Sequence, residues 1–301
     1  NTAIGYQSIF SNTLGINNTG IGFRSLYLNT SGSLNTAVGY EALSKNTSGR
    51  YNTAIGVDAL HYNTSGNYNT ATGLFSLALN TTGVENTASG ANALENNTIG
   101  SYNTATGRFA MRSNTTGLYN TAIGHSVLYS GTSGSYNTAS GYFSMYMNTD
   151  GLSNTANGYQ SLYRNSSGDF NTATGYKSMD SNTIGSYNTA IGASALIGNN
   201  HIGKYNTASG YSAMRRNVSG DGNTASGSYA LSNNTSGFSN TANGCYALYS
   251  NTTGQGNTAV GDSALYSNTT GYGNMAVGLK TLYSNTTGRI NTAAGDSALY
   301  K

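Results

Sequence analysis

Proline and tryptophan are absent from this chain of 301 residues, cysteine occurs once, and charged residues make up only 8% of it. The lack of proline suits a backbone whose N–H groups are nearly all used in hydrogen bonds between neighbouring segments. With Cys245 as the one thiol, the sequence excludes a disulfide framework and a cysteine metal cluster. The net charge is +3 and Arg215-Arg216 is the one basic doublet, so the basic stripe typical of nucleic-acid-binding proteins is missing.

The sequence also lacks long apolar runs and recognisable catalytic sets. No apolar run approaches membrane-spanning length, and no secretory signal peptide is visible. His61, His125 and His201 fall at different places of the repeat described below, so we expect them not to converge. The carboxylates are equally scattered, as shown by Glu41, Asp58, Glu85, Glu95 and Asp262. No paired acids, nucleophile with base, zinc-ligand spacing or phosphate loop is present, so we expect no enzyme, no cofactor and no metal site.

The sequence consists of tandem repeats of one 17-residue unit, for example residues 35–51, NTAVGYEALSKNTSGRY. A short period held over a whole chain is typical of a solenoid, in which each unit is one coil stacked on the next. The chain holds seventeen full coils and a last one cut at Lys301. The coils begin at Asn1, Asn18, Asn35, Asn52, Asn69, Asn86, Asn103, Asn120, Asn137, Asn154, Asn171, Asn188, Asn206, Asn223, Asn240, Asn257, Asn274 and Asn291.

We expect residues 1–301 to be a single repeat array forming one elongated rod. Solenoids normally carry distinct capping units. Neither end of this chain has one, so we expect the array to be a segment of a longer protein. The twelfth coil has one extra residue around Asn199-Asn200-His201, where a bulge would keep the strands in register.

Glycine recurs at places five and fifteen of the coil and predicts two corners, each needing a positive φ or a close approach of the backbone. Before the first corner, the segment Asn-Thr-Ala-x-Gly alternates, which predicts a parallel strand of about four or five residues with Ala pointing inward. The x-x-Ala-Leu-x-x stretch that follows is either a second strand or a single helical turn. The expected fold class is therefore all-β, a parallel β-solenoid of eighteen coils.

Place nine is always large and apolar, and together with Ala at place three and Ala or Ser at place eight it forms the predicted core. One coil buries too little apolar surface to offset the entropy of ordering its backbone. We therefore expect backbone stacking, side-chain ladders and neighbouring chains to supply the rest. The predicted core spine consists of Leu26, Leu43, Leu60, Leu77, Leu94, Met111, Leu128, Met145, Leu162, Met179, Leu196, Met214, Leu231, Leu248, Leu265, Leu282 and Leu299.

Asparagine recurs at place twelve, with Gly131 as the plain exception. Stacked amide side chains can hydrogen-bond the copy above and below, which predicts an Asn ladder. The same residues often spell Asn-x-Ser/Thr, so N-glycosylation is the alternative. We favour the ladder, because Asn persists at Asn12, Asn97, Asn148 and Asn182, where the third residue is neither Ser nor Thr. The ladder or glycosylation candidates are Asn29, Asn46, Asn63, Asn80, Asn114, Asn165, Asn217, Asn234, Asn251, Asn268 and Asn285.

Two outward surfaces repeat with the coil. Thr at place two and Thr, Ile, Ser or Val at place four predict an outward Thr-x-Thr-like array, a pattern that suits ice binding. The candidate array residues are Thr53, Thr70, Thr72, Thr104, Thr106, Thr172 and Thr174. Aromatic residues also share places, which predicts stacked columns at places six, ten and seventeen. Such columns either shield the edges of the stack or form a surface for sugars or proteins.

The phrase Asn-Thr-Ala-Ile-Gly, followed by x-x-Ala-Leu and later Thr-x-Gly, resembles the haemagglutinin-type head repeats of trimeric autotransporter adhesins. It is also similar to the repetitive arrays of phage-type tail-fibre proteins. The resemblance covers all 301 residues and rests on Ala at place three, Ile or Val at place four, the two glycines, and Ala or Ser at place eight. It implies a left-handed parallel β-roll that trimerises, although the unit here is longer than that family's repeat.

The leading functional expectation is a fibrous, non-enzymatic surface protein, an adhesin-like or tail-fibre-like stalk or head that displays a repetitive binding surface. Its partners would be a glycan or host-surface receptor and further copies of the chain, a trimer or a filament, at an extracellular, cell-surface or virion-surface location. One alternative is an ice-binding protein that uses the outward Thr array. The other is a self-assembling extracellular filament. Neither nucleic acid nor a membrane-spanning segment is expected.

Overall fold

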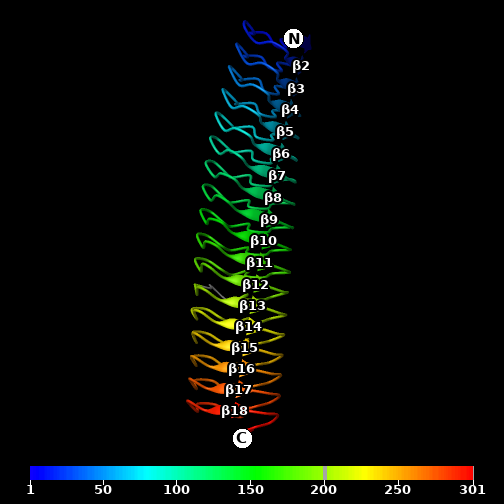
Figure 1. Cartoon of the computed structure of the whole chain (residues 1–301). Coiled ribbons are helices and arrows are strands. Elements are labelled where there is room, and N and C mark those ends of the chain that lie inside the picture. Colours follow the sequence, from blue (N-terminus) through cyan, green and yellow to red (C-terminus); the bar gives the residue numbers. More distant parts are fainter. Residues whose placement is uncertain (199–201, 301) are drawn as a thin grey trace. The chain divides into compact units, whose positions relative to one another are not determined.

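The computed structural model describes residues 1–198 and 202–300, and in these residues it contains strands and turns but no helix. The chain forms two units, Asn1–Leu152 and Ser153–Lys301, and each is built of nine coils (Figure 1). The prediction of an all-β parallel solenoid with one 17-residue repeat per coil is confirmed.

Within the first unit each strand pairs in parallel with the strand of the next coil, so that equal places of the repeat lie side by side. In the β3–β4 pair, Thr36 lies opposite Thr53 and Ala37 opposite Ala54. The strands of this unit are β1 (Thr2–Ile4), β2 (Thr19–Ile21), β3 (Thr36–Val38), β4 (Thr53–Ile55), β5 (Thr70–Thr72), β6 (Thr87–Ser89), β7 (Thr104–Thr106), β8 (Thr121–Ile123) and β9 (Thr138–Ser140).

The second unit repeats the same parallel, in-register pairing, including the coil that carries the extra residue. Across that coil Thr189 lies opposite Thr207, so the register is kept as expected; the surplus residue itself, placed by the sequence at 199–201, lies outside the described residues. The strands are β10 (Thr155–Asn157), β11 (Thr172–Thr174), β12 (Thr189–Ile191), β13 (Thr207–Ser209), β14 (Thr224–Ser226), β15 (Thr241–Asn243), β16 (Thr258–Val260), β17 (Met275–Val277) and β18 (Thr292–Ala294).

The strands are three residues long, shorter than the four or five predicted, because the glycine at place five turns the chain sharply. Gly56 has a φ of 136°, a conformation that side chains rarely adopt. A Cβ at Gly56 would also lie only 2.6 Å from the carbonyl oxygen of Gly73 in the next coil. This corner therefore needs glycine for both of the reasons that the sequence suggested.

The stretch at places six to eleven is neither a second strand nor a helical turn. Its residues at places seven and nine have positive φ, 53° at Asp58 and 51° at Leu60. The Asp58 N–H donates to Tyr40 of the preceding coil at 2.9 Å, and the Leu60 N–H donates to Ser76 of the following coil at 3.0 Å. Positive φ in non-glycine residues costs on the order of 1 kcal/mol each, and these bonds between coils offset that cost.

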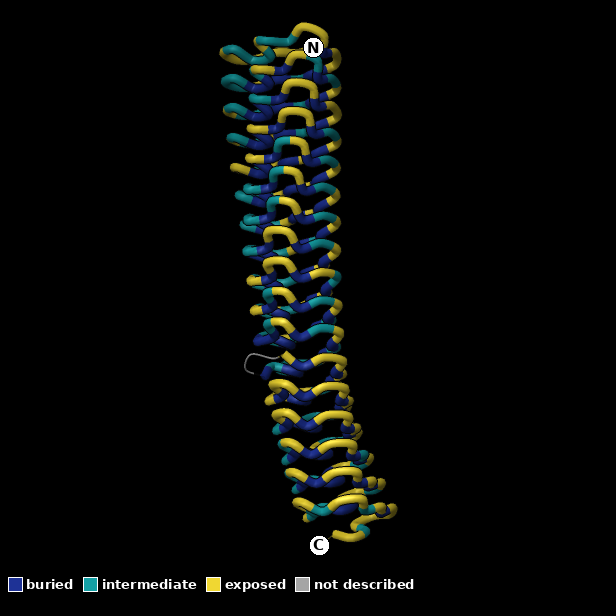
Figure 2. Tube along the Cα trace, turned by 90° about the vertical axis from the view of Figure 1, so that its left-hand side faces the viewer, coloured by how far each residue is buried: buried dark blue, intermediate teal, exposed yellow. Residues whose placement is uncertain are grey.

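The residues of the core spine are buried, apart from the last one. Figure 2 shows that buried residues, in dark blue, recur in every coil. The side chains at place nine from Leu26 to Leu265 are at most 3% exposed, and Leu282 is 4% exposed. Leu299 differs from the prediction, because it is 57% exposed. Ala at place three and the small residue at place eight fill the remaining interior, so the core of each coil is thin.

Candidate functional site

Two buried ladders of asparagine run through the coils, one at place twelve and one at place one. In the first ladder, Asn63 Nδ2 donates to Asn46 Oδ1 at 2.9 Å and to the carbonyl oxygen of Gly66 at 3.0 Å. In the second ladder, Asn52 Nδ2 donates to the same Gly66 oxygen at 2.9 Å, and the Asn52 N–H donates to Asn35 Oδ1 at 3.0 Å. The sequence predicted the first ladder but not the second.

The eleven place-twelve asparagines that carry Asn-x-Ser/Thr occupy ladder positions. Ten of them are at most 3% exposed, and Asn285 is half-buried. At Asn46, for example, Nδ2 donates one hydrogen to Asn29 Oδ1 at 2.7 Å and the other to Gly49 O at 3.0 Å. An amide nitrogen with both hydrogens used and no exposed surface leaves no room for a glycan in the folded coil. The geometry thus supports the ladder over glycosylation.

The second glycine, at place fifteen, is required by these ladders and not by its own φ. A Cβ at Gly66 would lie 2.4 Å from Asn63 Oδ1 and 2.4 Å from the Gly83 carbonyl oxygen. The ladder is interrupted where Gly131 replaces asparagine, and a small cavity of about 10 Å³ lies there, lined by Asn114 and Gly131 among others. Asn182 Oδ1 is buried without a hydrogen bond in the described part of the chain; the next ladder position, residue 199, lies outside that part.

The outward positions of the strands form two parallel columns. Place two is Thr in every strand except β17, where it is Met275, and none of these side chains is buried. Of the predicted array, Thr53 and Thr172 are half-buried, and the others are exposed: Thr70, Thr72, Thr104, Thr106 and Thr174. Place four varies in chemistry, with Asn157 and Asn243 among its members.

The predicted aromatic columns are present as stacked rings. At place seventeen, Tyr102 and Tyr119 stack at 4.7 Å between ring centroids, and Tyr119 and Tyr136 stack at 5.2 Å. Other stacks are Tyr51–Tyr68 at 4.7 Å, Phe170–Tyr187 at 5.0 Å, Tyr187–Tyr205 at 5.1 Å, Tyr249–Tyr266 at 5.2 Å, Tyr266–Tyr283 at 5.0 Å, Tyr283–Tyr300 at 5.1 Å and Tyr159–Tyr176 at 5.3 Å. The place-seventeen rings are 41–63% exposed, and we call them the aromatic column.

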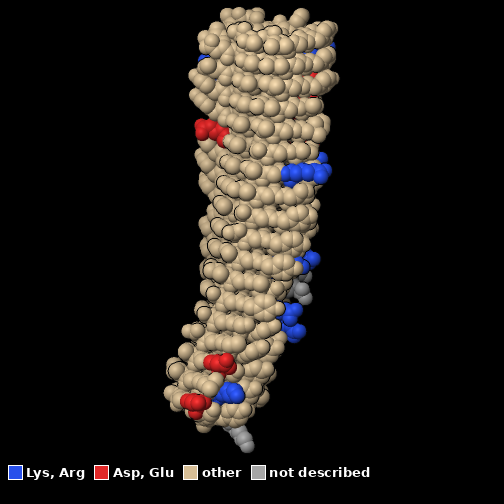
Figure 3. Space-filling model, turned by 90° about the vertical axis from the view of Figure 1, so that its right-hand side faces the viewer, with Lys and Arg blue, Asp and Glu red and all other residues tan. Residues whose placement is uncertain are grey.

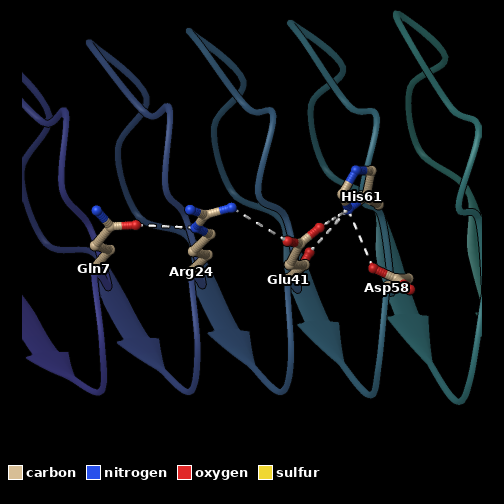
Figure 4. Close-up of polar contacts among 5 residues, drawn as sticks. All are labelled: Gln7, Arg24, Glu41, Asp58 and His61. Atoms are coloured by element: carbon tan, nitrogen blue, oxygen red, sulfur yellow. Dashed lines mark hydrogen bonds and ion pairs between the residues drawn. The ribbon is translucent and has the colours of Figure 1, made fainter.

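The expectation that histidines and carboxylates are scattered is wrong for one group, Glu41, Asp58 and His61. His61 Nδ1 lies 3.2 Å from Asp58 Oδ1 and 3.5 Å from Glu41 Oε2, and the three donor atoms are all within 4.8 Å of one another. Figure 4 shows these side chains at the end of a polar row in which Arg24 Nε donates to Gln7 Oε1 at 2.9 Å and Arg24 Nη1 lies 4.0 Å from Glu41 Oε1. We call Glu41, Asp58 and His61 the acidic–histidine cluster.

A hollow of about 340 Å³ adjoins this cluster. It lies at Ala78, whose small side chain occupies the place-ten position between His61 and Glu95 of the neighbouring coils. Glu95 on the far wall is already held by Arg112 Nε at 2.7 Å and by Asn92 Nδ2 at 2.9 Å. The free acceptor capacity facing the hollow therefore lies mainly with the cluster itself.

Burial raises the pKa of Asp58 above its ordinary value of 3.8; nearby His61 opposes that shift, and the Glu41 carboxylate adds to it. Two carboxyl groups thus lie together in a partly buried place, where the Glu41 carboxylate disfavours the charge on Asp58. Place seven of one coil and places seven and ten of the next coil hold these three residues. A search of the sequence for charged residues at spacings of 17 and 3 would have found them.

The remaining surface carries little charge, and the face seen in Figure 3 shows only scattered Lys, Arg, Asp and Glu. His125 lies outside the cluster, beside Ser126 and stacked on Tyr142 at 5.3 Å, and His201 is outside the described residues. Among residues 1–198 and 202–300 there is no helix with the length and apolarity needed to span a bilayer.

No protein-family model matches the chain, and no curated protein matches it either. The likeness to adhesin head repeats and tail-fibre arrays accordingly rests on the repeat motif alone.

Proposed function

We propose that the chain is a fibrous, non-enzymatic surface protein, adhesin-like or tail-fibre-like, that acts outside the cell or on a virion. The observation that carries this proposal is the contrast between the inside and the outside of the coil. The buried amides and backbone groups are used in ladders, whereas the outside repeats columns of tyrosine and threonine in register. A rigid interior with a periodic exterior suits the display of many equal contacts, which raises avidity without strong single contacts.

The aromatic column is the surface we assign to binding. Tyr and Phe offer large contact area at low cost in side-chain entropy, and exposed rings of this kind are enriched at binding surfaces. The rings at place seventeen are stacked on one another, so their order is already established before a partner arrives. The partner class that fits is a glycan or a receptor on a host surface, which would meet several rings at once.

The test is binding of the purified chain to immobilised glycans and to whole cells. Replacing Tyr102, Tyr119 and Tyr136 by Ser removes three rings of the column, and Ser is compatible there because Ser153 and Ser239 occupy the same place with the same positive φ. We expect the wild-type chain to bind and the triple variant to bind at least about tenfold more weakly, since several contacts are lost together.

The matched control removes three tyrosines from the less exposed column at place ten, by Tyr249→Ser, Tyr266→Ser and Tyr283→Ser. This variant should keep most of the binding. A folded wild-type chain that binds no glycan and no cell surface would contradict the display function. Equal losses in both triple variants would contradict the assignment to the aromatic column.

Ice binding is the second candidate, favoured by the exposed Thr columns. In-register strands repeat about every 4.8 Å, and places two and four are about 6.6 Å apart along a strand, so the hydroxyl and methyl groups form a regular lattice. Thr104 and Thr106 sit in one strand with both side chains exposed. Measured growth rates of ice crystals decide this candidate. Arrest of growth that Thr104→Tyr weakens would support it, and normal growth at high protein concentration would remove it.

We also propose a homo-oligomer, with a trimer favoured over an open filament. Apolar side chains at place four face outward and are exposed, as at Ile4, Ile55 and Ile123, which are 58%, 43% and 49% exposed. Burying such positions against further copies would supply apolar contact that the thin core lacks. Light scattering coupled to size exclusion tests this directly. A constant mass of three chains supports the trimer, mass that grows with concentration supports a filament, and a single-chain mass contradicts both.

A further inference from the structure

We infer that the acidic–histidine cluster is a site for a divalent transition-metal ion, with Zn²⁺ the best fit, which joins the coils of Glu41 and Asp58. The cluster offers one imidazole nitrogen and two carboxylate groups from two neighbouring coils. Imidazole and carboxylate are the protein ligands that Zn²⁺ combines with water in three-ligand sites. No residue of this site is used by the display function proposed above.

The distances within the cluster match those between the ligands of one ion. Tetrahedral bonds of about 2.0–2.1 Å place ligand atoms roughly 3.3–3.4 Å apart. His61 Nδ1 lies 3.2 Å from Asp58 Oδ1 and 3.5 Å from Glu41 Oε2. An ion that replaces the proton at Nδ1 could thus contact both carboxylates with little movement of the side chains.

Hydrogen bonds from His61 alone cannot pair all the oxygen atoms that face its ring nitrogen. His61 Nδ1 faces three acceptors, Asp58 Oδ1, Glu41 Oε2 and the Glu41 carbonyl oxygen at 3.3 Å, but it can carry only one hydrogen. Arg24 is the nearest guanidinium, and it lies 4.0 Å from the other oxygen of Glu41. A divalent cation at Nδ1 would contact both facing carboxylate oxygens and would remove the repulsion between the two carboxylates.

The residues around the cluster hold the His61 ring in place and leave space for solvent beside it. The His61 residue is 9% exposed, and its ring meets the Tyr62 ring edge-on with 4.6 Å between centroids. The hollow at Ala78 lies beside the cluster and has room for water, which would complete the coordination of the ion. The three ligand residues come from two neighbouring coils, so a bound ion would connect those coils directly.

The experiment is calorimetric titration of the untagged 301-residue chain with Zn²⁺ alone in metal-free buffer at neutral pH. We expect one ion per chain at this site. The variants H61A and D58N should bind at least about 100-fold more weakly, since the first removes the imidazole ligand and the second removes the negative charge of a carboxylate ligand. The repeat itself indicates that both variants fold, because Ala78 occupies place ten in the next coil and Asn92 occupies place seven in the coil after that.

H125A is the matched control, because it removes a histidine outside the cluster and should leave the affinity unchanged. A second readout is amide hydrogen exchange over residues 35–68, which should slow on adding Zn²⁺ in the wild type and in H125A but not in D58N. Absorption of the Co²⁺-loaded chain in the visible region should likewise be lost in H61A. Zn²⁺ binding that is absent, or that H61A and D58N leave unchanged, would show that the cluster holds its histidine by polar contacts alone. Either result would overturn the inference, whatever the outcome of the glycan and cell assays.

Discussion

Asn86 and Asn97 donate their side-chain amides to one acceptor, the carbonyl oxygen of Gly100, at 2.8 and 2.9 Å. The two residues belong to different ladders but to the same coil, so this oxygen is the point where the ladders meet. Gly100 must lack a side chain here, because a Cβ would clash with Asn97 Oδ1 and with the Gly117 carbonyl oxygen of the next coil. Three of the most regular features of the repeat, two asparagines and one glycine, are thus explained by a single buried arrangement of hydrogen bonds.

Loss of a ladder amide should be costly, whereas loss of its sequence neighbour should not. Asn97→Ala leaves Asn80 Oδ1 and one hydrogen of Asn114 Nδ2 without their partners, which lie at 2.8 and 2.7 Å. Each buried unpaired group costs about 1–3 kcal/mol, so we expect a loss of about 2–6 kcal/mol in free energy of unfolding. Asn96→Ala removes a half-buried amide with no ladder role and should cost less than about 0.5 kcal/mol. Chemical denaturation of both variants checks this, and equal losses would contradict it.

The gap at Gly131 should be repairable. Gly131→Asn restores an amide at the interruption, fills the small cavity beside Asn114, and needs no positive φ. One or two new hydrogen bonds and the lower entropy of the unfolded chain should raise the free energy of unfolding by about 1–2 kcal/mol. Gly131→Ala is the control, because it changes the backbone entropy without adding an amide. If Asn stabilises no more than Ala in denaturation experiments, the ladder does not extend across this coil.

The place-fifteen glycine should tolerate no side chain, in contrast to an exposed glycine at place seventeen. Gly66→Ala places a Cβ within 2.4 Å of Asn63 Oδ1 and of the next carbonyl oxygen, and we expect a loss of about 2–3 kcal/mol or more from overpacking. Gly256 has a φ of 61° and nothing within 4 Å of an added Cβ, and Asn17 adopts the same conformation at the same place. Gly256→Asn should therefore be close to neutral. Midpoints of thermal unfolding compare the two variants, and similar shifts would refute the distinction.

Much of this architecture could be predicted from the sequence because residues 17 apart become direct neighbours. The inward Leu60 and Leu77, the place-twelve amides and the stacked tyrosines all follow from that one relation. The second ladder was missed because Asn at place one, such as Asn52, stands outside the Thr-Ala-x alternation of the strand, so the pattern does not indicate that it is buried. Its burial depends on the carbonyl of Gly66, whose direction the residue pattern does not encode.

The acidic–histidine cluster was missed for a related reason. Glu41 and Asp58 are 17 residues apart and so could be expected to stack, but His61 joins them from a different place of the repeat. It does so because the backbone at places seven and nine adopts positive φ, as at Asp58 and Leu60. A positive φ is uncommon in aspartate and leucine, so the residue types at places seven and nine do not predict this backbone conformation.

Asp180 should make the stability of the second unit depend on pH. Burial raises the pKa of Asp180 above its ordinary value of 3.8, and Arg164, Lys177 and a hydrogen bond from Ser181 only partly oppose the shift. The folded state then holds the proton more tightly than the unfolded state, so its contribution to stability is full below pH 3.8 and is lost as pH rises through the folded pKa. Asp180→Asn cannot lose a proton, so it should match the wild type at the acidic end and be the more stable of the two at neutral pH. Unfolding midpoints measured from acidic to neutral pH for both proteins test this, and two parallel curves would show that burial at Asp180 does not govern its charge.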